Sequence, residues 1–178
     1  MPATEVVDDE PDAADRTAVA ALLGRAPSGG YTIVVRHVDR SPVVIRNQPL
    51  LDDGTPMPTR WWLVGEPERT LVSRLESRGG VPEAEAEIGL DAIADAHERY
   101  AAAREAAMSV DWTGPRPSGG VGGTRRGVKC LHAHYAWHLA GGDDPVGRWV
   151  GERLAAGAGD RHLDPTRTIH EREQSSRG

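Results

Sequence analysis

The sequence predicts an α+β fold, a single domain in which a small antiparallel sheet of about three strands near the N-terminus is covered by C-terminal helices. Residues 31–38 alternate in polarity and are rich in β-branched side chains, which is typical of a strand. Residues 42–46 predict a second strand, and the short segment 39–41 between them is typical of a hairpin. Residues 59–64 follow a turn-forming segment and predict a third strand. After Pro67 the apolar spacing becomes helical, and strands grouped before helices indicate α+β rather than alternating α/β.

Proline, glycine and aspartate residues mark where the predicted helices begin and end. Pro67 opens a helix that Gly79 ends, and Gly89 is a candidate division in the alanine-rich stretch that follows. Asp144 and Pro145 are typical of an N-cap and a first helical turn. The expected helices therefore cover residues 13–24, 67–79, 82–108 and 128–140, with a last one from residue 145.

The pattern within these elements also predicts which side chains are buried. Trp61 and Trp62 are adjacent on a predicted strand, so their indoles should lie on opposite faces of the sheet, one in the core and the other at a cleft or an interface. His97 lies among acidic residues of a predicted helix, and we expect it to be exposed.

The chain has 178 residues, enough for one domain with a sizeable core. We expect residues 1–12 to form a disordered acidic tail, because they combine clustered acids with proline. Residues 13–157 are expected to form the single α+β domain, and residues 158–178 a mobile polar tail.

Net charge and cysteine content indicate which binding partners and which cellular compartment to expect. The formal net charge of −6 argues against nucleic acid or an anionic membrane as the partner of the whole surface. Cys130 is the single cysteine, so there is no internal disulfide, which fits a reducing compartment. No stretch approaches the length of a membrane span. We therefore expect a cytoplasmic protein with no membrane partner.

A glycine-rich basic loop at residues 119–127 is the first candidate binding site. Thr124, Arg125, Arg126 and Lys129 bring a hydroxyl and three cations close to a predicted helix start. Backbone N–H groups, a helix N-terminus and fixed cations together are typical of a phosphate or carboxylate site. Gly122 and Gly127 have the spacing of a Walker A loop, but Val128-Lys129 replaces its Lys-Ser/Thr pair. The loop is not a dinucleotide fingerprint either, because no strand precedes it. The alternative is a flexible linker whose arginines are only solvated.

The predicted helix after this loop is the second candidate. Cys130, His134 and His138 would share one face of a helix that turns roughly 100° per residue. Cys130 and His138 would lie about 12 Å apart along the axis, so at most an adjacent pair could bind one ion and other ligands must come from elsewhere. The alternative is that the histidines are core residues hydrogen-bonded to backbone or carboxylate groups.

Two blocks carry a resemblance to a known family. The first covers residues 53–63 and continues to 73–76; the second is the Lys-Cys-Leu-His segment at 129–132, with Asp-Pro-Val-Gly at 144–147. On these motifs the chain resembles the bacterial family called domain of unknown function 501, over about residues 31–149. That family has no established activity, and its genes tend to lie near those for a septum-formation initiator and an exopolyphosphatase-like protein.

The resemblance implies a metal-ligand set. Some members of the family carry cysteines at three positions that are His37, Asp39 and Gly65 in this chain. The first two would lie across from Cys130 and His132, with zinc as the expected divalent metal. Gly65 supplies no ligand, so the alternative is that the metal has been lost and only packing remains. The candidate metal ligands are His37, Asp39, Cys130, His132 and His134.

These observations favour two functions. The first is a small domain that binds a divalent metal, a small anionic ligand or both, with metal-assisted hydrolysis as the simplest reaction. The second is a non-enzymatic module in cell division or envelope housekeeping, with structural histidines and a protein partner bound through the basic loop and an exposed Trp. RNA or nucleotide binding by the basic loop is a weaker third alternative.

Overall fold

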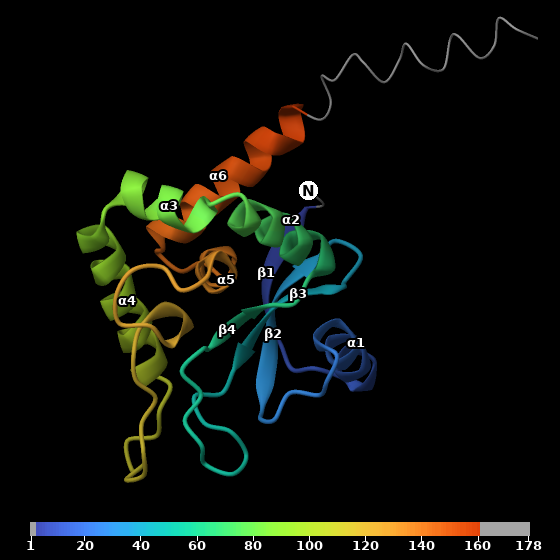
Figure 1. Cartoon of the computed structure of the whole chain (residues 1–178). Helices are drawn as coiled ribbons and strands as arrows, with labels where there is room; N and C mark the ends of the chain where they lie inside the picture. Colours follow the sequence, from blue (N-terminus) through green and yellow to red (C-terminus); the bar gives the residue numbers. More distant parts are fainter. Residues whose placement is uncertain (1–2, 161–178) are drawn as a thin grey trace, which may run out of the picture.

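The computed structural model describes residues 3–160 and confirms the α+β fold (Figure 1). Its single antiparallel sheet has four strands in the order β1-β2-β3-β4. The strands are β1 (Thr4–Asp9), β2 (Tyr31–His37), β3 (Pro42–Asn47) and β4 (Trp61–Leu63). The three strands expected from the sequence are therefore present, and one more precedes them.

The additional strand β1 corrects the expectation of a disordered tail over residues 1–12. It pairs antiparallel with β2. Its acids are held by arginines of the neighbouring strands and turn: Asp9 lies 2.7 Å from Arg36, and Asp8 lies 2.6 Å from Arg46. The acidic residues that suggested disorder are thus counter-charges, and their partners are far away in the sequence.

The helices follow the predicted order closely. They are α1 (Ala13–Leu23), α2 (Glu66–Ser77), α3 (Gly80–Ile88), α4 (Leu90–Glu105), α5 (Leu131–Leu139) and α6 (Pro145–Asp160), with a 3₁₀ turn at Val121–Gly123. Gly89 separates α3 from α4 as expected, with φ of 85°. Asp144 caps α6, because its Oδ1 accepts the N–H groups of Val146 and Gly147 at 2.9 Å.

The sheet has a core on each face. The larger core packs the sheet against α2 to α6, and the smaller lies between the sheet and α1 (Figure 1). Trp61 belongs to the larger core and Trp62 packs against the smaller one, which confirms that the two indoles lie on opposite faces.

The C-terminal boundary differs from the expected one, because α6 extends to Asp160 and so passes residue 157. The rest of the tail expected at 158–178 lies outside the described residues. Among residues 3–160, no helix combines the length and apolar character needed to cross a membrane.

Candidate functional site

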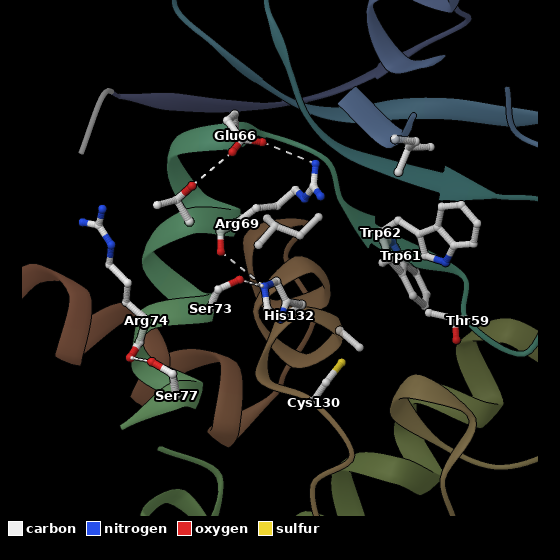
Figure 2. Close-up of a pocket in the computed structure, with 14 residues that line it drawn as sticks. Thr59, Trp61, Trp62, Glu66, Arg69, Ser73, Arg74, Ser77, Cys130 and His132 are labelled. Carbon is white, nitrogen blue, oxygen red and sulfur yellow. Dashed lines mark hydrogen bonds and ion pairs between the residues drawn. The ribbon is translucent and has the colours of Figure 1, made fainter. Parts of the chain in front are cut away.

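A cleft of about 700 Å³ lies between α2, the edge strand β4 and the start of α5 (Figure 2). The α2 wall is polar, since Arg69, Ser73 and Ser77 recur every four residues along one face. The opposite wall is apolar and carries the two tryptophans of β4. The cleft is lined by Leu23, Thr59, Trp61, Trp62, Leu63, Glu66, Arg69, Thr70, Ser73, Arg74, Ser77, Cys130, His132 and Ala133.

Glu76, in the last turn of α2, joins this wall to α5. Its Oε1 accepts the backbone N–H of Leu131, the first residue of α5, at 2.5 Å. The same oxygen lies 3.2 Å from Nδ1 of His132. One carboxylate therefore satisfies a free N–H of the helix start and contacts the imidazole one residue further on.

Glu76, Cys130 and His132 form a group of three possible metal ligands. The carboxylate oxygen, the sulfur and a ring nitrogen all lie within 4.8 Å of one another, and each residue is half-buried. In the part of the chain that the structure describes, this is the one group of three or more His, Cys, Asp or Glu residues that meets this criterion. A thiolate, an imidazole and a carboxylate are ligands that zinc accepts, and three protein ligands with a further open position are typical of catalytic zinc sites.

The imidazole of His132 is oriented by α2. Its Nε2 donates to the carbonyl oxygen of Arg69 at 3.3 Å and lies 3.2 Å from Oγ of Ser73 (Figure 2). A proton on Nε2 leaves the lone pair on Nδ1, which is the nitrogen that faces Glu76. Such a bond to the distal nitrogen is the usual way in which proteins orient a metal-binding histidine.

The charge around His132 favours its protonated form. Burial acts to lower the pKa of the ring, but the interactions with Cys130 and the negative charge of Glu76 outweigh it, so the pKa of His132 lies above its ordinary value. A cation is therefore stabilised where the three candidate ligands meet, and a metal ion would compete with that proton.

Two arginines supply positive charge to the cleft. Arg69 is held in place, because its Nη1 donates to the carbonyl oxygen of Leu22 at 2.6 Å. Arg74 is exposed, and among the described residues its guanidinium has no hydrogen-bond or ion-pair partner. An anionic ligand in the cleft would find one fixed and one free guanidinium on the α2 wall (Figure 2).

Comparison with known proteins identifies the family. The model of the family described as "Protein of unknown function (DUF501)" matches residues 33–152, more than half of the chain. The chain belongs to this family. No curated protein and no solved structure matches it. The DUF501 match includes β2 from Ile33 onward, β3, β4 and every residue that lines the cleft except Leu23.

The structure brings together two of the five metal ligands expected from the sequence, Cys130 and His132. His134 lies elsewhere: it is fully buried, and its Nδ1 is 2.7 Å from Oδ2 of Asp144. Its partner is the carboxylate that caps α6, so His134 fits the alternative of a core histidine.

His37 and Asp39 also lie outside the Cys130 group. His37, at the end of β2, is 3.4 Å from the buried carboxylate of Glu68, and Asp39 is exposed and accepts from Ser41 within the β2–β3 turn. The structure thus groups Cys130 and His132 with Glu76, and not with His37 and Asp39. Glu76 closes the 73–76 motif of the sequence, but nothing in the sequence paired it with the segment at 129–132.

Cys130 precedes α5 and has an extended backbone, with φ −157° and ψ 143°. The helical wheel that placed Cys130 on one face with His134 and His138 therefore does not apply to it. This backbone turns the sulfur into the cleft (Figure 2), whereas His134, one turn into the helix, is in the core.

The glycine-rich loop is fastened to the helices beside it. His97 of α4 accepts the N–H of Val121 at 3.1 Å through Nδ1 and donates to the carbonyl of Gly127 at 2.9 Å through Nε2. Glu85 of α3 accepts the N–H of Val128 at 2.7 Å. His97 is therefore buried, with 6% of its surface exposed, and not exposed as expected, because the loop covers it.

The four residues expected to bind an anion lie outside the cleft lining. Thr124 donates to the carbonyl of Arg126 within the loop. Arg125, Arg126 and Lys129 are exposed, and no ion pair involving their side chains is found among residues 3–160. The loop thus presents unpaired cations on a surface apart from the cleft.

Proposed function

We propose that this chain binds a divalent metal ion, with zinc the best match, through Glu76, Cys130 and His132, and that it hydrolyses an anionic substrate held in the adjoining cleft. The observation that carries the proposal is the convergence of three ligand atoms within 4.8 Å at the edge of a cleft of about 700 Å³. Bound there, the ion would polarise the substrate and activate a water molecule.

The chain's own residues would prepare this site before any ligand arrives. The Arg69 carbonyl and Ser73 hold His132 with Nδ1 turned toward Glu76, where a metal ion would take the place of its proton. The N–H of Leu131 fixes the carboxylate of Glu76. Both ligands are thereby positioned by bonds that involve α2, which supports a preorganised site.

The two walls of the cleft indicate the class of substrate. Arg74 offers a free guanidinium for a phosphate or carboxylate group, and the hydroxyl of Thr70 lies on the same face of α2. Trp61 and Trp62 supply an apolar surface opposite. A ligand with an anionic group and a flat or apolar part fits both walls.

The test is metal analysis of chain purified without a histidine tag. We expect His138→Ala to keep the metal content of the unsubstituted chain, and Cys130→Ser and His132→Ala each to contain about one equivalent less. His138→Ala is the matched control because it removes a half-buried histidine of the same helix that lies outside the ligand group. Equal metal content in all four proteins would contradict the proposal.

Hydrolysis is tested on the same proteins. The metal-loaded chain is assayed with aryl phosphate and aryl carboxylate esters, and turnover should follow metal content across the variants. Metal binding without turnover of either ester would restrict the function to metal binding.

Two other functions remain proposals supported by separate observations. The unpaired cations of the glycine-rich loop support binding of a small anion at Thr124, Arg125, Arg126 and Lys129. The apolar wall at Trp61 and Trp62 supports the alternative of a protein-interaction module, which metal-free chain that binds a partner through these tryptophans would favour.

A further inference from the structure

A second pair of titratable side chains lies apart from the cleft, where β2 ends against the start of α2. His37 is the last residue of β2, and Glu68 lies in the first turn of α2. Nε2 of His37 is 3.4 Å from Oε2 of Glu68. Glu68 is fully buried, and only 6% of the surface of His37 is exposed.

Neither side chain has a hydrogen bond within the described residues. Both carboxylate oxygens of Glu68 and both ring nitrogens of His37 are buried without such a partner. Buried polar groups are nearly always hydrogen-bonded, and a buried carboxylate without partners is strongly unfavourable. Apart from the ion-pair contact between Nε2 and Oε2, the four atoms have no partner, which leaves them available to a bound species.

The backbone at Gly65 allows the carboxylate to reach this position. A Cβ added at Gly65 would lie 2.6 Å from Oε2 of Glu68 and 3.2 Å from the backbone of Val43. Any larger residue would displace Glu68 or the strand. Glycine at this position thus makes room for the carboxylate oxygen that faces His37.

His37 of this pair lines a cavity of about 300 Å³ that is open to solvent. His37 lines it together with Asp39, Ser41, Gly65 and Glu66, and no lysine or arginine is among its lining residues. Asp39 carries a negative charge there, because the hydrogen bonds from Ser41 lower the pKa of its carboxyl group. The surroundings of the imidazole are therefore acidic, which suits a cation.

We propose that His37 and Glu68 bind a second divalent transition-metal ion, with water in the remaining positions toward the cavity. An imidazole nitrogen and a carboxylate oxygen without a thiolate form a harder ligand set than the Cys130 group, one that accepts Mn²⁺, Co²⁺ or Zn²⁺. The linings of this cavity and of the cleft share only Glu66, so the two sites are separate.

The experiment uses Cys130→Ser full-length chain, in which the Cys130 group is disabled, and titrates it with Mn²⁺ and Co²⁺ while bound metal and thermal midpoint are measured. About one equivalent should bind and raise the midpoint. Adding Glu68→Gln or His37→Ala should weaken binding more than about 100-fold, beyond the loss seen for outer-sphere partners. Adding Glu98→Gln, an exposed carboxylate on α4, should change nothing.

Each outcome decides the proposal. Binding that survives Glu68→Gln, or no binding in a folded Cys130→Ser chain, would overturn it; the latter result would mean that His37 and Glu68 are only an ion pair. If His37→Ala fails to fold, the isosteric Glu68→Gln variant still gives the answer. The sulfur-to-cobalt absorption band of chain with Cys130 intact reports the Cys130 group alone, so failure of one site is distinguishable from failure of the other.

Discussion

The entry to α5 and its first turns carry similar residue types in opposite settings. At the start of α5, Cys130 and His132 are half-buried and line a cleft. His134 is fully buried, and Asp144 is its hydrogen-bond partner. The comparison shows that residue type and spacing alone did not separate a candidate ligand from a structural histidine; backbone geometry and the position of a carboxylate did.

The largest expected effect is on the free energy of unfolding and concerns the buried pair of His134 and Asp144. Asp144→Ala removes the partner of His134 and the cap of α6 together. We expect a loss of about 2–4 kcal/mol in the free energy of unfolding, measured by urea denaturation of metal-free chain. The control is Asp143→Ala, an exposed neighbour whose ion pairs lie on the surface, with a much smaller loss. Equal losses would show that the buried pair has no special role.

A smaller effect is expected on metal affinity at the cleft that Cys130 and His132 line. Ser73→Ala removes the hydroxyl 3.2 Å from Nε2 of His132. Metal affinity should fall about 10-fold, with little change in the stability of metal-free chain. Ser77→Ala is the matched control, because Ser77 lines the same wall but donates to the Arg74 carbonyl instead. Identical affinities in both variants would mean that Ser73 does not orient the ring.

The smallest effect is a difference in pH dependence along the helix. Burial lowers the pKa of His138, so its contribution to stability is present above about pH 6.5 and is lost as pH falls toward its folded pKa. His132 has a raised pKa, so its contribution is present below about pH 6.5 and is lost as pH rises through its folded pKa.

Urea unfolding of metal-free chain from about pH 5 to pH 8 checks this difference. His138→Ala should flatten the acid side of the profile and His132→Ala the neutral side, each by less than about 1.4 kcal/mol per pH unit. A His132→Ala profile that matches the unsubstituted chain above pH 6.5 would contradict the opposite settings of the two rings.

Most of the fold could be predicted because its signals are local. The hairpin at β2 and β3, the break at Gly89 and the cap at Asp144 each depend on neighbouring residues. Strand β1 could not, because its acids are neutralised by Arg36, Arg40 and Arg46, which follow much later in the chain.

The site was predictable only in part for the same reason. The 129–132 motif identified Cys130 and His132, but Glu76 reaches them through the packing of α2 against α5. The burial of His97 depends on Gly120, where a Cβ would lie 2.3 Å from the His97 Cβ, so this glycine lets the loop close over the ring. Close approaches between distant segments leave no periodic pattern in the sequence, so they could not be predicted from it.

The bond between Glu76 and Leu131 spans 55 positions of the chain. The two partners of this bond are separated by α3, α4 and the glycine-rich loop, so closing it restricts a long segment and is entropically unfavourable until those elements have packed. During folding, the ligand group should therefore assemble among the last contacts, and a chain arrested with α3 and α4 unpacked would contain Cys130 and His132 without their carboxylate. Under the proposed function, acquisition of tight metal binding would then mark completion of the native fold.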